Sequence, residues 1–366
     1  MTARPPRLTR IVPQSQEAFV RHRPAALAAL ATAGLCLTAA DAAAQRLFRS
    51  TAPVEVTFTT SLKKLVGERD STRLNPYGAL MTYKDSSGKE ASLPVVLRAR
   101  GHFRRQARNC YFPPIRWDAK RADVQGTLFQ GLTRMKITTE CRPGNADYQQ
   151  YILAEYAVYR AYQVVSPLHF RTRLARITYK DSAKATPDVT SWAYFIEDDG
   201  EMARDNNMKV VDQKGALFED LDQRQLMITT LFEYMVGNTD VSISGLHNIV
   251  LLRDSTGLAI HPVAYDFDFS GLVNTRYATP DPRLGIRRVT DRLHRGPCKP
   301  LDEWKPVFAY FQSKRAAIDS VYGTIPDLSP GRAKDARSYL DDFWKVIAND
   351  RDAKAEIVDR CQKLGM

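Results

Sequence analysis

The sequence predicts an α+β fold with two lobes: a β-rich lobe over residues 45–200 that carries one long helix, and a mainly helical lobe over residues 201–366. In the first half, short segments alternate apolar and polar side chains, which is typical of strands. Beyond about residue 207, apolar residues recur at helical spacing instead. The 366 residues are 26% charged and 44% hydrophobic, as expected for a globular chain with room for two lobes.

The first 44 residues are predicted to be a signal peptide. Five arginines precede or flank a small-residue apolar run from Ala25 to Ala40, and Ala42 to Ala44 offers a cleavage pattern. A membrane anchor or a buried alanine-rich helix is the alternative, but the run is short for a bilayer. Leu35 directly before Cys36 argues against lipid attachment. We therefore expect an exported protein, periplasmic or secreted, with no transmembrane segment in the mature chain.

The net charge favours anionic partners. The whole chain carries a formal charge of +12, and removal of the five leader arginines with Glu17 and Asp41 leaves +9. Such a charge suits nucleotides, acidic proteins or anionic envelope polymers. No long run of Lys and Arg predicts a nucleic-acid-binding arm.

Four cysteines remain in the mature chain, which allows two disulfides in an oxidising compartment with three possible connectivities. We expect Cys110 to pair with Cys141 and Cys298 with Cys361, because each of these pairs staples a local region of the chain.

The β-rich lobe is predicted from a series of alternating segments. Four of them are read as strands: residues 54–60, 77–84, 91–100 and 132–139, of which the second and third form a hairpin. Residues 111–117 contain two adjacent prolines, so an edge strand or an extended segment is expected there.

An arginine-rich turn follows the third strand. Residues 98–105 place four arginines around Gly101. Backbone N–H groups of a glycine turn together with guanidinium groups such as those of Arg100 and Arg104 can bind phosphate oxygens. The alternative is an ordinary solvated turn.

A long helix is predicted to begin near Ala146. Glu155 lies on its apolar stripe, where a carboxylate needs a partner. Lys136, on the preceding strand, is the cation that we expect to pair with it, because a strand lysine and a helix glutamate hold the nucleotide phosphates in kinases. Local pairing of Glu155 with Arg160 or Arg171 is the alternative.

The remaining elements follow in order. Residues 171–180 and 192–196 are predicted strands, and the acidic turn after the second resembles a link between lobes. Residues 222–236 form an amphipathic helix that Gly237 ends. Residues 249–252 and 258–260 then form a hairpin. The tail from residue 302 to 362 is mainly helical.

Four polar residues around this hairpin form the candidate site. Asp240 follows the helix, where a carboxylate can accept a proton from an acceptor hydroxyl or align it. Asn248 opens the hairpin, and Asp266 and Asp268 follow it. Amide and carboxylate oxygens of this kind suit Mg²⁺ or Mn²⁺ that bridges nucleotide phosphates.

These residues resemble a known family. Asn238 to Asp240, His247 with Asn248, and Asp266 to Asp268 are similar to the catalytic and metal-binding segments of the spore-coat protein H (CotH) kinase family. Residues 97–104 and 194–197 resemble further segments of that family. The resemblance implies a protein-kinase-like two-lobed fold, ATP, a divalent metal and phosphoryl transfer to a protein hydroxyl. It gives Asp240 the catalytic role, and Asn248 and Asp266 the metal.

The cation that meets the phosphates is left open. Lys136 is the first choice and Arg100 or Arg104 the second, because the sequence has no glycine-rich loop of the ordinary kinase type. Two other functions also stay open: a non-catalytic envelope binding or assembly protein, and a metal-dependent hydrolase in which His261 joins Asp266 and Asp268.

Overall fold

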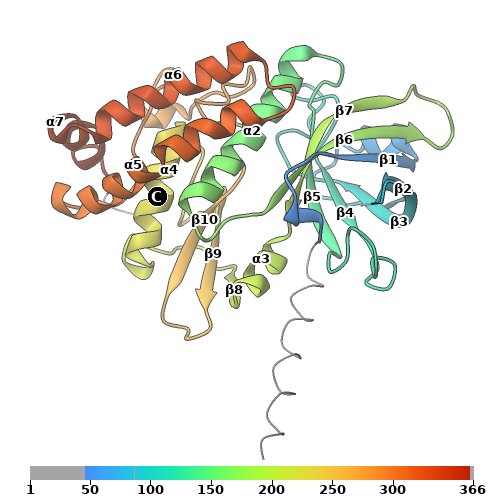
Figure 1. The fold of residues 1–366 in the computed structure, drawn as a ribbon, viewed down its shortest axis with the longest axis horizontal. Coiled ribbons are helices and arrows are strands. Elements are labelled where there is room, and N and C mark those ends of the chain that lie inside the picture. The colour runs from blue at the N-terminus through green and yellow to red at the C-terminus, as the bar shows by residue number, and fades with distance from the viewer. Residues whose placement is uncertain (1–45, 86, 363–366) are drawn as a thin grey trace, which may run out of the picture. The chain divides into compact units, whose positions relative to one another are not determined.

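A closed β-barrel is the largest β element of the computed structural model, which describes residues 46–85 and 87–362. Its strands are β1 (Val54–Thr60), β2 (Tyr77–Lys84), β3 (Glu90–Ala99), β4 (Ile115–Asp118), β5 (Arg134–Thr139), β6 (Thr172–Asp181) and β7 (Val189–Glu197). Around the barrel the order is β1-β2-β3-β4-β5-β7-β6. Every neighbouring pair is antiparallel except β1 and β6, whose parallel pairing closes the barrel (Figure 1).

The expected two-lobed protein-kinase-like fold is therefore wrong. Six of the seven barrel strands lie where the sequence predicts them, but the strands close on themselves and do not form the sheet of a kinase N-lobe. Alternating positions of the strands point into the barrel and form one apolar core, with Phe58, Ile137, Ile177 and Phe195 among its buried residues. Alternation predicts which face of a strand is buried, but it does not predict which strand lies beside it.

The segment with two prolines also differs from the expectation. Residues 115–118 form β4, which pairs with both β3 and β5 and is not an edge strand. Pro113 and Pro114 lie just before the strand, so they remove no hydrogen bond from its ladders.

Helix α2 (Ala146–Val165) joins the barrel to the helical part of the chain. Asn145 caps its first turn by accepting a hydrogen bond from the N–H of Asp147. One side of α2 contacts β6 and β7, and the helix also contacts α4 (Gln223–Val236) and α5 (Leu301–Thr324). Such a helix is buried nearly all round, which places Glu155 in the interior.

The helical part positions the second half of the site. Asp222 caps α4, and Gly237 ends it in the left-handed conformation with φ of 68°. β8 (Met208–Val211), which precedes α4, forms a three-stranded sheet with β9 (Ile249–Asp254) and β10 (Ile260–Ala264), which follow it. The other helices are α1 (Leu62–Gly67), α3 (Asp199–Asp205), α6 (Pro330–Ile347) and α7 (Asp350–Ala353).

The described cysteines form two disulfides, Cys110–Cys141 and Cys298–Cys361, which confirms the expected pairing. Disulfides of this kind are consistent with an exported protein. None of the helices within the described residues has the length and apolar character needed to cross a membrane. The predicted signal peptide, residues 1–44, lies outside the described residues.

Candidate metal centre

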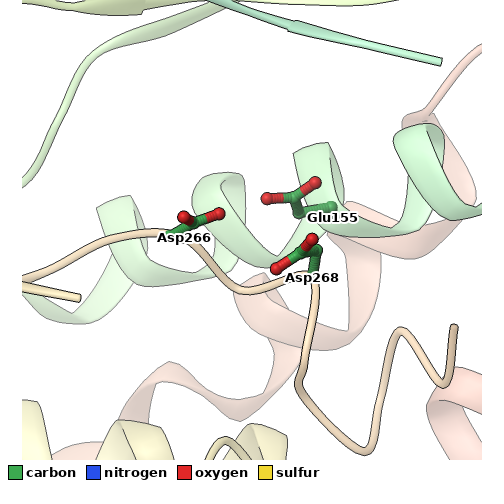
Figure 2. A group of neighbouring side chains, drawn as sticks. All are labelled: Glu155, Asp266 and Asp268. Carbon is green, nitrogen blue, oxygen red and sulfur yellow. The ribbon is translucent and has the colours of Figure 1, made fainter. Parts of the chain in front are cut away.

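The carboxylate groups of three residues lie close together. Glu155 comes from α2, and Asp266 and Asp268 come from the loop after β10. One potential ligand oxygen from each residue lies within 4.8 Å of those of the other two (Figure 2). Oε1 of Glu155 is buried and has no hydrogen-bond partner. An orphaned buried oxygen beside two further carboxylates is the arrangement that a divalent cation would satisfy.

The loop after β10 is held against α2 by contacts on both sides of Asp266. The backbone N–H of Asp266 donates a hydrogen bond of 2.8 Å to the hydroxyl of Tyr159 on α2. Phe267 is fully buried, with its ring 4.9 Å from that of Tyr159 and 5.7 Å from that of Phe232. Asp266 itself has φ of 63°, a left-handed conformation that is unusual for a residue with a side chain. Such strain is often found at functional sites.

Electrostatic repulsion within the cluster is strong. Burial, and then the charges of Asp268 and Asp266, hold the pKa of Glu155 well above its ordinary value. Burial raises the pKa of Asp268 to about 7, and the charge of Asp266 adds to this shift. A cation bound between these groups would reverse both effects, because it favours the ionised carboxylates.

Arg104 is the cation that faces the cluster. Its side chain is buried and donates a hydrogen bond to the carbonyl of Thr139 at the end of β5. Burial acts to lower the pKa of Arg104, but the charges of Tyr277, Asp268 and Glu155 outweigh burial, so the pKa is raised. This residue was the second choice for the phosphate-binding cation, and its role in binding stays a prediction.

The loop that carries Arg104 is held by a disulfide and by aromatic packing. The disulfide Cys110–Cys141 ties it to the residues just after β5. Phe103 packs its ring 5.3 Å from that of Phe269 and 5.8 Å from that of Tyr277. Tyr277 in turn donates a 3.0 Å hydrogen bond to Asp268, nine positions earlier in irregular chain, where no local pattern predicts such a contact.

Lys136 lies elsewhere, and its expected ion pair with Glu155 is wrong. The ammonium group pairs with Asp199 at 2.5 Å and lies 4.8 Å from the centre of the Tyr265 ring. The reason is register. Burial raises the pKa of Tyr194 and the charge of Glu155 adds to this shift, so Glu155 lies near Tyr194. The β5 residue that pairs with Tyr194 is Thr138, two residues beyond Lys136. Sequence spacing between a strand and a helix does not fix this offset.

Arg100, the other second choice, is half-buried near the same loop. Burial raises the pKa of Tyr265 to about 12, and the charge of Arg100 opposes that shift. Arg100 acts in the same direction on Tyr159. The charge of Arg100 therefore acts on Tyr265, which precedes Asp266 in the sequence, and on Tyr159, whose hydroxyl accepts a hydrogen bond from the N–H of Asp266.

Asp240 is held by the residues that the sequence grouped with it. Nε2 of His247 lies 3.0 Å from one carboxylate oxygen of Asp240. The side-chain N–H₂ of Asn248 donates to the other oxygen at 3.2 Å and to the carbonyl of Asp240 at 2.7 Å. Asn248 has φ of 55°, which turns its side chain back toward Asp240. The hydrogen bond with Asp240 is the main cause of a raised pKa at His247.

Asp240 lies at the edge of an open pocket of about 620 Å³. His247, Ser242, Asp281 and Arg295 also line this pocket. Burial and then the charge of Asp266 are the main causes of the raised pKa of Asp268, and the charge of Asp240 adds a smaller contribution. The catalytic role of Asp240 and a metal-ligand role for Asn248 stay predictions.

His261 does not join the cluster. Its Nδ1 lies 4.0 Å from Asp222 at the start of α4. The metal-binding group within the described residues consists of Glu155, Asp266 and Asp268. No family model and no curated protein matches the chain.

Proposed function

We propose that this protein is an exported, metal-dependent phosphotransferase that moves a phosphoryl group from a nucleotide such as ATP to a hydroxyl of a protein or of another envelope molecule. The observation that carries the proposal is the carboxylate cluster of Glu155, Asp266 and Asp268 with its orphaned buried oxygen. An arginine whose charge acts on the cluster and a half-exposed carboxylate at a pocket would supply the two remaining needs of the reaction.

The residues of the cluster fit Mg²⁺ or Mn²⁺. All three donors are hard carboxylate oxygens, and neither histidine nor cysteine belongs to the group. When bound, such an ion would neutralise phosphate oxygens and the charge that develops on them. Glu155, which we first assigned to a phosphate-binding ion pair, would act as a metal ligand instead.

The cationic side of the site suits phosphate groups. Arg104 is buried, fixed by the carbonyl of Thr139, and close enough to act on Asp268 and Glu155. Its Nε is buried without a partner. Guanidinium groups bind phosphate oxygens through paired N–H donors. Arg104 would therefore hold a phosphate beside the metal, with Arg100 as the second cation.

Asp240 is placed to act on the acceptor. Its carboxylate is oriented by His247 and Asn248 and lies at the edge of the pocket of about 620 Å³. An acceptor hydroxyl in that pocket would meet this carboxylate, which would align the hydroxyl and take its proton. The resemblance of these segments to the CotH kinase family supports the same assignment of roles, although the two-lobed fold does not carry over.

The proposal is tested with the mature protein, labelled ATP and Mn²⁺ or Mg²⁺. We expect label to be incorporated into the protein or an added acceptor only when the metal is present. Asp240→Asn should abolish transfer but keep metal binding, whereas Asp266→Asn should abolish both. Asp342→Asn, on the exposed surface of α6, is the matched control. Metal binding without any transfer would favour the non-catalytic envelope binding protein, and transfer that survives both variants would contradict the proposal.

A further inference from the structure

A second pocket, of about 760 Å³, lies at the end of the barrel where β1 and β6 begin and β2 ends. It is lined by Val54 at the start of β1, Lys84 at the end of β2 and Arg173 near the start of β6. Arg104, whose charge acts on the carboxylate cluster, follows β3 and is hydrogen-bonded to Thr139 at the end of β5. The volume is in the range of small-molecule sites. Nothing in the proposed function uses this pocket.

Arg173, a nearly buried residue that lines this pocket, has no counterion among the described residues. Arg173 is only 6% exposed and shares its barrel-facing register with Ala175 and Ile177. Its guanidinium donates to two backbone carbonyls, that of Ala52 and, at 2.7 Å, that of Leu47. Among residues 46–85 and 87–362, Nη2 has no hydrogen-bond partner and Arg173 forms no ion pair with a carboxylate. A buried charge of this kind is costly unless an opposite charge meets it.

The acidic side chains that line the pocket interact with residues other than Arg173. Glu55 lies 3.8 Å from Lys84 in an exposed ion pair. Asp85 accepts hydrogen bonds from Ser87 and from the backbone N–H of Lys89. Arg46 adds a further cation to the lining. Burial lowers the pKa of Arg173, because no carboxylate compensates for it. The pocket therefore offers the unpaired Nη2 donor of Arg173 and positive charge to a ligand from outside the chain.

We propose that this pocket binds an anionic ligand through an oxyanion group, a phosphate or a carboxylate, that pairs with Nη2 of Arg173. Arginine pairs strongly with both groups because its planar N–H donors match their oxygens. Arg46 and Lys84 would meet further negative charge of the ligand at the rim. The pocket shares no lining residue with the carboxylate cluster.

The probes are inorganic phosphate and citrate, each compared with chloride at matched ionic strength and without divalent metal. We expect at least one oxyanion to raise the melting temperature of the mature protein by about 2 °C or more when it is present far above its dissociation constant. Phosphate alone would identify a phosphate ligand, and citrate alone a carboxylate. Equal melting temperatures in all three salts would overturn the proposal.

Variants test whether Arg173 carries the oxyanion effect. Arg173→Met should remove the oxyanion effect, and Arg173→Lys should weaken it while it keeps the charge. Arg351→Met, at an exposed position of α7, is the control and should leave the effect unchanged. If Arg173→Met does not fold, a crystal of the wild-type protein soaked in phosphate gives the answer: density for the ion at Nη2 of Arg173 supports the site, and density only at Arg104 overturns it. An oxyanion effect that persists in Arg173→Met would also overturn it.

Discussion

Glu155 is the residue at which the cost of the carboxylate cluster is greatest. It is 2% exposed, and one of its oxygens has no partner. Without a metal, the buried charges of Glu155, Asp266 and Asp268 repel one another, and the fold bears that cost. With a metal, the same groups become its ligands. Removing the charge of Glu155 should therefore raise the stability of the metal-free protein and lower its affinity for a metal.

Glu155→Gln should stabilise the metal-free protein and weaken its affinity for Mn²⁺. The amide removes a buried ionisable group, so we expect the free energy of unfolding to rise by about 1 kcal/mol or more. Loss of a ligand should reduce Mn²⁺ affinity roughly tenfold or more. Urea denaturation without metal and calorimetric titration with Mn²⁺ measure the two effects. Glu303→Gln, at an exposed position, is the control and should change neither.

His294 should make the stability of the fold depend on pH. Burial lowers its pKa to about 4, although a 2.9 Å hydrogen bond between Nδ1 and the carbonyl of Ile357 opposes this shift. The unfolded chain titrates near 6.5, so it binds the proton more readily. The contribution of His294 is therefore fully present above pH 6.5 and is lost as the pH falls toward 4, where the loss reaches about 3 kcal/mol.

This dependence is measured by urea denaturation at pH 7.5 and pH 4. His294→Gln cannot titrate, so the variant should lose less stability between the two values than the wild-type protein does. Equal losses in both proteins would show that His294 is not the titrating group.

At the scale of elements, the loop between β3 and β4 connects the disulfide to the site. Cys110–Cys141 ties this loop to the end of β5, and the loop carries Arg104 and Phe103. Replacing both cysteines by serine should therefore lower the affinity for ATP, because Arg104 is no longer held at the cluster. The free energy of unfolding should also fall, by roughly 2 to 4 kcal/mol.

The second disulfide provides the control for this prediction. Cys298–Cys361 joins the start of α5 to the chain end, away from Arg104. Its removal should cost stability of the same order but leave ATP affinity unchanged, as measured by calorimetry with Mn²⁺ present. An equal loss of ATP affinity in both variants would mean that general destabilisation, and not the position of Arg104, is responsible.

Elements with strong local signals could be predicted from the sequence. Asn145 before α2 and Gly237 after α4 mark helix ends through side-chain capping and the left-handed conformation, both of which are local effects. The β9–β10 hairpin was also predicted, since its turn residues act within a few positions. The position of β4 was missed as a central strand because its prolines lie just outside the ladder.

At the scale of the whole molecule, the pairing of distant segments could not be predicted. The parallel pairing of β1 with β6 closes the barrel, yet about 120 residues separate the strands and nothing in their alternation specifies a partner. The same limit applies to the site. The sequence identified Glu155 as a buried carboxylate in need of a partner, but only the docking of α2 against the loop after β10 shows that two aspartates meet it.

Two charged sites adjoin the barrel. Arg104, whose charge acts on the carboxylate cluster, is hydrogen-bonded to Thr139 at the end of β5, and the pocket near Val54 contains Arg173. One site would take a cation and a nucleotide, the other an anion. Substitutions of pocket residues should therefore leave metal binding at the cluster intact, because no residue of the cluster lines the pocket.

The most direct test of the metal centre is a calorimetric titration of the metal-free mature protein with Mn²⁺, carried out in parallel with Asp266→Asn and Asp268→Asn. We predict one binding site per chain in the wild-type protein and a loss of binding in both variants, since each removes one of the three carboxylates that converge in the cluster. Absence of Mn²⁺ binding in the wild-type protein, or binding that both variants retain, would contradict the account.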